Sequence, residues 1–195
     1  MRVGNWLSIR QAQTLLNTPD VSTKKGLRDR AMLAVLLGCG LRRSEVAGLT
    51  LRHIQQRDSP WCIVDLVGKH GRVRTIPMPT WVKVAIDSWT LAAGLVEGHV
   101  LRPVNRSDQA QGERMSEKVV WQLLQPYATA AGVPGIAPHD LRRSCAKMCR
   151  AAGGELEQIQ LLLGHASVQT TERYLGTRQD LAHAPNDGIK LRVAV

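Results

Sequence analysis

The chain has 195 residues, with 26 Lys and Arg against 16 Asp and Glu, which gives a formal net charge of +10. This length suits one domain with a sizeable core, and the positive surplus favours a polyanionic partner. Nucleic acid is preferred to a membrane surface because the sequence shows no basic amphipathic anchor, no apolar run of ~18 residues and no signal peptide. We therefore expect a cytoplasmic protein that binds double-stranded DNA and does not bind a membrane.

The first fifty residues predict three helices. Ser8 and Gln11 form a capping-box pattern that opens a helix reaching about Leu16. A long apolar helix is expected over 27–37, closed by the glycines that follow it. A short helix over 42–49 then carries Arg42 and Glu45 on one face.

A small sheet is expected next, and helices after it. Residues 61–67 and 72–77 alternate as two strands of a hairpin with Lys69 and His70 at its tip, and residues 51–55 are a candidate third strand. Helical patterns cover about 80–93, 116–131, 138–152 and 155–163, with a polar loop over 102–113. The fold class is thus α+β and mainly α: a helical bundle with a small antiparallel three-stranded sheet.

Four cysteines lack the spacing of a redox or zinc motif. Cys39, Cys62, Cys145 and Cys149 contain no CxxC pair, so buried thiols are expected and no metal site is predicted. The i,i+4 spacing of Cys145 and Cys149 leaves a metal site as the alternative, although no second ligand pair accompanies them.

The last third of the chain concentrates residues suited to holding a phosphodiester. His139 and Arg142 lie at i,i+3 in the first turn of a predicted helix, where the dipole favours an anion. Taken alone, this pattern favours a solvated basic face, and Arg42 alone favours a surface arginine paired with Glu45. Tyr174 has polar neighbours, unlike the other tyrosine, Tyr127, which belongs to an amphipathic helix.

Five segments, taken in order, resemble the catalytic domain of the tyrosine recombinases, the phage integrase family. They are GLRRSE at 40–45, GKHGRVRTIP at 68–77, HDLR at 139–142, LLGH at 162–165, and a tyrosine nine residues after His165. The resemblance implies the tyrosine-recombinase catalytic fold over residues 1–176 and a C-terminal tail over 177–195. The N-terminal clamp domain of most relatives is expected to be absent, with weak and salt-dependent DNA binding as the consequence.

The resemblance also implies a mechanism without a cofactor. Tyr174 would attack the scissile phosphate to give a 3′-phosphotyrosyl link, while Lys69 protonates the leaving 5′-oxygen. The phosphate would be held by Arg42, Arg142, His139 and His165, with His139 as the expected proton acceptor and Glu45 as the supporting acid. Further DNA contacts are expected from Arg43, His70, Arg72 and Arg143; His70 departs from the Gly or Thr usual at its position.

Two other functions and two roles for the tail stay open. A type IB topoisomerase-like activity shares the chemistry, and a non-cutting DNA-binding relic of a mobile element would share the fold. The recombinase is expected to be a monomer alone and a tetramer on paired DNA sites. In the tail, residues 189–195 alternate as a strand that could add to the sheet edge in cis or in trans; a frayed terminus is the alternative.

Overall fold

The computed structural model describes residues 5–68, 71, 73–164 and 184–193, and it confirms a mainly helical domain with a three-stranded antiparallel sheet. Its elements, in chain order, are α1 Ile9–Leu16, α2 Lys24–Cys39, α3 Arg43–Gly48, η1 Leu51–His53, β1 Ile54–Gln56, β2 Trp61–Val67, β3 Val73–Met78, α4 Thr80–Ala93, α5 Glu117–Ala130, α6 Pro138–Ala151, α7 Leu156–Leu163 and η3 Pro185–Gly188. None of the helices in these ranges is long and apolar enough to cross a membrane.

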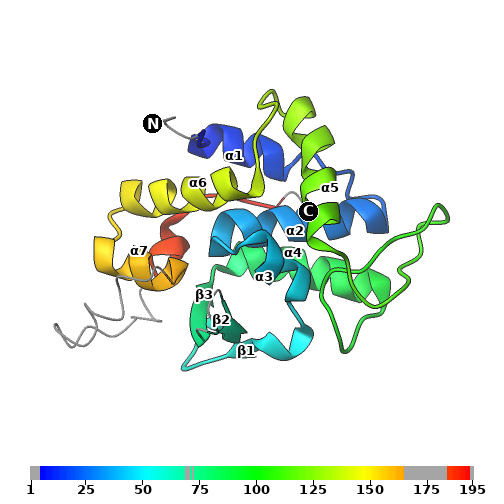
Figure 1. Ribbon diagram of the computed structural model, residues 1–195, viewed down its shortest axis with the longest axis horizontal. Coiled ribbons are helices and arrows are strands. Elements are labelled where there is room, and N and C mark those ends of the chain that lie inside the picture. Colours follow the sequence, from blue (N-terminus) through cyan, green and yellow to red (C-terminus); the bar gives the residue numbers. More distant parts are fainter. Residues whose placement is uncertain (1–4, 69–70, 72, 165–183, 194–195) are drawn as a thin grey trace.

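Helix α2 is the centre of the core. It runs between α1 and α6 on one side and α4 on the other (Figure 1), and it is buried along nearly its whole length from Arg28 to Cys39. A Cβ atom on Gly38 would lie 2.4 Å from Cγ2 of Val82, so glycine is what lets α2 and α4 approach this closely. The helix begins earlier than the sequence predicted, because Thr23 accepts a hydrogen bond from the Gly26 amide and caps it.

The sheet has the order β1-β2-β3 and contains one bulge. Ile63 pairs with Ile76, whereas the next recorded pair is Leu66 with Arg74, so β2 has one residue more than β3 in this interval. Asp65 takes a positive φ of 53° at this point. The shift places Arg74 opposite a buried leucine, on the core side of the sheet.

The described residues 189–193 of the tail form no strand within this chain, and strand packing in trans stays a prediction. Helix η3 instead sits among α6, α2 and β3, and the buried Asn186 side chain donates to the carbonyls of Gly38 and Pro77. The backbone of Arg192 then pairs with the side chain of Gln13, its amide donating over 2.7 Å and its carbonyl accepting over 2.6 Å. A side chain of α1 thus satisfies the backbone of Arg192.

Candidate functional site

Glu45 on α3 lies at the centre of a buried network of charged side chains. Arg42, the residue that caps α3, donates its backbone amide to Oε2 over 2.7 Å and Nη1 to Oε1 over 2.9 Å. The Glu45 side chain is 2% exposed and that of Arg42 is 30% exposed. The carboxylate therefore fixes both the backbone and the guanidinium of Arg42, which still reaches solvent.

Arg74 approaches the same carboxylate from strand β3. Its Nη1 and Nη2 donate to the two Glu45 oxygens over 2.8 and 2.9 Å, in the bidentate arrangement that guanidinium and carboxylate favour. Burial raises the pKa of Glu45, but the hydrogen bonds and charge of Arg74, aided by Arg42, outweigh burial and lower it to about 2. Glu45 is consequently ionised at any physiological pH.

Arg142 enters from α6 and is buried. Its guanidinium donates to the carbonyls of Gly40 and Leu163, the residues at the ends of α2 and α7. Burial, and then the positive charge of Arg42, lower the pKa of Arg142 to about 10, so it remains protonated at neutral pH. Arg42 and Arg74 thus bind one carboxylate, and Arg142 lies within electrostatic range of it. The three guanidinium groups and one carboxylate leave a surplus of two positive charges.

An open hollow of about 480 Å³ lies between the beginnings of α3 and α6. Arg42, Arg142 and the exposed His139 all line it. Arg43 and Glu117 of α5 also line it and form an ion pair of 3.4 Å, with both side chains about half exposed. A second hollow of about 410 Å³ lies on the other side of α3, towards the hairpin, and Arg42 lines that one too.

The structure brings together Arg42, Glu45, His139 and Arg142, which the sequence predicted to share a site. Arg43 lies on the same hollow, whereas Arg143 is not among its lining residues and lies 4.0 Å from Asp140 on its own helix. The remaining predicted residues fall outside the described ranges: Lys69, His70, Arg72, His165 and Tyr174.

Arg74 is the site residue that the sequence reasoning missed. A signal for it exists, because Arg74 and the fully buried Ile76 are two residues apart on one strand and so share a face. An arginine in the core-facing row of a strand needs a buried partner, and Glu45 is that partner.

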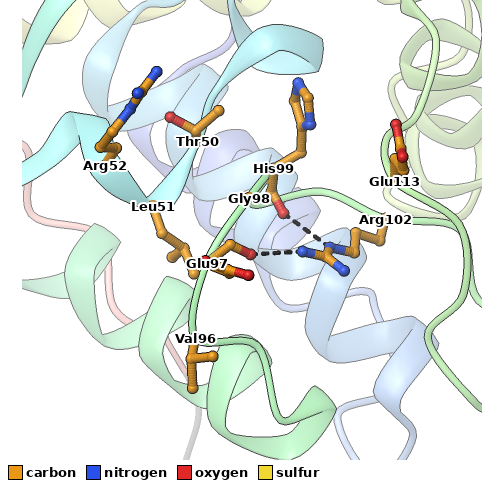
Figure 2. A pocket seen from close by; sticks show the side chains of 9 residues that line it. All are labelled: Thr50, Leu51, Arg52, Val96, Glu97, Gly98, His99, Arg102 and Glu113. Atoms are coloured by element: carbon orange, nitrogen blue, oxygen red, sulfur yellow. Dashed lines mark hydrogen bonds between the residues drawn. The ribbon is translucent and has the colours of Figure 1, made fainter.

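A third hollow, of about 720 Å³, lies elsewhere and shares no lining residue with the other two (Figure 2). It lies between the turn at 50–52 and the loop that contains residues 96–102. The Arg102 guanidinium is already used there, because it donates to the carbonyls of Glu97 and His99 over 2.6 and 3.3 Å. This hollow therefore contributes nothing to the arginine network.

The cysteines are packing residues. All four are buried free thiols, as the sequence predicted. A hydrogen bond with Cys149, together with burial, raises the pKa of Cys145 well above its ordinary value. Among the residues with a described placement, no group of three or more His, Cys, Asp or Glu side chains could hold a metal ion.

Known proteins resemble this chain in sequence. The profile of the phage integrase family matches residues 5–180. The tyrosine recombinase XerD of Yersinia pestis is 34% identical over 177 residues, which are 86% of this chain and 56% of that protein. The tyrosine recombinase XerC of Roseiflexus castenholzii is 32% identical over 187 residues, 92% of this chain and 57% of that protein. The chain thus spans a little over half the length of these relatives.

Solved structures share the fold. The crystal structure of XerA recombinase superimposes with a TM-score of 0.67 at 22% identity, covering 90% of this chain and 61% of that one. The XerH site-specific recombinase bound to its difH substrate also gives 0.67, at 19% identity, covering 92% of this chain and 52% of that one. The expected tyrosine-recombinase catalytic fold is confirmed.

Proposed function

This chain belongs to the phage integrase family, and we propose that it is the catalytic domain of a site-specific DNA recombinase. The observation that carries the proposal is the convergence of Arg42, Arg142 and His139 on one open hollow. These residues come from segments about a hundred positions apart, and a structural salt bridge alone would not require an exposed histidine beside two arginines. The site of action is expected to be the cytoplasm.

The proposed reaction is a transesterification in which bonds and protons balance. The phenol oxygen of Tyr174 forms a bond to the scissile phosphorus and its proton passes to His139. The bond from phosphorus to the 5′-oxygen breaks, and Lys69 supplies the proton that this oxygen needs. A 5′-hydroxyl of the partner strand later reverses the step, and no nucleotide is consumed because the covalent link retains the bond energy.

The charge of the arginine network supports this chemistry. A phosphodiester carries one negative charge, and a further charge develops as the nucleophile adds. The surplus of two positive charges around Glu45 matches that demand in a site where fixed donors need not reorganise. Arg42, which is partly exposed, and Arg142, which lines the same hollow, are proposed to contact the phosphate. Arg142 also holds the backbone that frames the hollow.

The remaining predicted residues complete the proposal. His165 is assigned to the phosphate beside the two arginines. Arg43 is proposed to contact DNA at the edge of the hollow, as are His70, Arg72 and Arg143. Paired DNA sites are proposed to assemble four copies of a protein that is a monomer alone.

The decisive test is a covalent adduct trapped on nicked duplexes of pooled random sequence and resolved on a denaturing gel. The parent protein should form the adduct and Tyr174→Phe should not. Tyr127→Phe is the matched control, because Tyr127 is the other tyrosine and donates to Asp29 away from the hollow. Salt-sensitive binding without any adduct would refute cleavage and leave a DNA-binding protein. Relaxation of supercoils without strand exchange would instead indicate a topoisomerase.

A further inference from the structure

We propose that Arg74 is a positioning residue that holds Arg42 and the end of α7 in one fixed arrangement. This inference rests on the proposed recombinase function and names a residue for that same site. Arg74 need not touch DNA; it acts through Glu45 and through the backbone of α7.

The first arm of the arrangement runs from Arg74 to Arg42. Arg74 uses both terminal nitrogens on the Glu45 carboxylate, and that carboxylate accepts two hydrogen bonds from Arg42. Because both Glu45 oxygens are shared in this way, the angle at which Arg74 meets the carboxylate also sets the direction of the Arg42 guanidinium. Arg42 is the more exposed of the two arginines, with 30% of its side chain exposed against 10% for Arg74.

The second arm runs from Arg74 to the last turn of α7. Its Nε donates to the Leu162 carbonyl over 3.4 Å, while Arg142 donates to the neighbouring carbonyl of Leu163. Two carbonyls that the end of a helix leaves without helical partners are thus met by arginines from β3 and α6.

Close packing supports the second arm. A Cβ atom on Gly164 would lie 2.7 Å from Cδ of Arg74, and Gly164 has a φ of +64° that favours glycine. Helix α7 therefore ends against the Arg74 side chain. The residue that follows Gly164 is the predicted catalytic His165, so the segment that leads to Tyr174 begins at a point that Arg74 fixes.

Replacing Arg74 by lysine distinguishes a positioning role of Arg74 from simple neutralisation of the Glu45 charge. Lysine keeps the positive charge, but its single ammonium cannot present three nitrogens in the planar fork that spans a carboxylate and a carbonyl. If Arg74 only balances charge, Arg74→Lys should behave as the parent does. If Arg74 positions Arg42 and α7, Arg74→Lys should be impaired although it keeps the positive charge.

The experiment compares Arg74→Lys with the parent in two readouts. In single-turnover cleavage of a nicked duplex, we expect a rate about 10- to 100-fold lower, with the dissociation constant for the same duplex changed by less than about threefold. Arg150→Lys is the matched control, since Arg150 also donates to a backbone carbonyl, that of Gly154, but lies outside the hollows. The control should cleave at the parent rate.

Amide hydrogen exchange gives the second readout and needs no catalysis. The Arg42 amide donates to Glu45 and the Gly164 amide to the Gln160 carbonyl. Both should exchange at least about tenfold faster in Arg74→Lys and remain unchanged in Arg150→Lys. If the parent protein forms no adduct, the proposed function fails. Amide hydrogen exchange would still decide whether Arg74 has the positioning role.

Two results would overturn the positioning role. One is cleavage by Arg74→Lys within about twofold of the parent rate. The other is unchanged exchange at both amides, because the two arms would then not depend on the arginine fork. If Arg74→Lys does not fold, Arg74→Gln is used, since its planar amide can still donate to one Glu45 oxygen; it should show the same pattern.

Discussion

Replacing Glu45 by Gln should remove most of the stability that the charged network provides. The lowering of the Glu45 pKa from its ordinary 4.5 to about 2 measures how strongly the fold favours the ionised form. At 1.36 kcal/mol for each unit, the ionised carboxylate contributes about 3 kcal/mol at pH 7. Solvent screening is small because the Glu45 side chain is 2% exposed. Glutamine would leave Arg42 and Arg74 close together without the neutralising charge.

The loss should depend on pH in one direction. A carboxylate with a lowered folded pKa stabilises the protein fully above its unfolded value, near 4.5, and loses that effect as pH falls towards 2. Glutamine does not titrate. The difference in free energy of unfolding between Glu45→Gln and the parent should therefore be about 3 kcal/mol at pH 7 and shrink progressively below pH ~4.5.

Urea denaturation at several pH values measures this difference, and thermal unfolding should show a midpoint about 6–12 °C lower at pH 7. Asp87→Asn is the control, because the 56% exposed Asp87 side chain pairs with Lys83 at the surface, and surface pairs contribute at most about 1 kcal/mol. A loss for Glu45→Gln no larger than that of the control would refute the reasoning. So would a loss that stays constant down to the acid limit of folding.

Three further substitutions test the packing of the domain by the same unfolding assay. Tyr127→Phe removes the 2.7 Å hydrogen bond to the buried Asp29 and should destabilise by about 1–3 kcal/mol; no loss would mean that water replaces the hydroxyl. Asn186→Ala leaves two buried carbonyls without their side-chain donor and should cost about 1–3 kcal/mol, whereas a value near zero would show that the tail is not anchored there. Gly38→Ala places a methyl group against Val82 and should cost at least about 1–3 kcal/mol, unless α4 can shift without loss.

The sequence could predict what local patterns encode. The capping box at Ser8, the glycine that ends α2 and the proline at the start of α6 all act within one helical turn. Helix α1, the end of α2 and the beginning of α6 therefore lie close to where they were expected. The same holds for the placement of His139 and Arg142, whose relation depends only on the helix between them. Family resemblance supplied the rest of the predicted site.

The sequence could not predict contacts between distant segments. Arg74 finds Glu45 29 positions upstream and Leu162 88 positions downstream, and no local pattern encodes either distance. The tail shows the same limit. Its alternation does not say whether a strand or a side chain, here Gln13 at 179 positions, will satisfy the backbone of Arg192.

The position of Arg42 is a property of the whole domain, because helix α3 has only six residues and is far too short to hold a side chain by itself. Contacts made by residues before and after Arg42 in the sequence fix its position instead. Two residues before it, Gly40 gives its carbonyl to Arg142 and packs so closely on Leu163 that a Cβ atom would lie 2.8 Å from Cδ2 of that residue. Three residues after it, Glu45 is held by Arg74. Substitutions that disturb either set of contacts should therefore impair the proposed cleavage even where they touch no DNA.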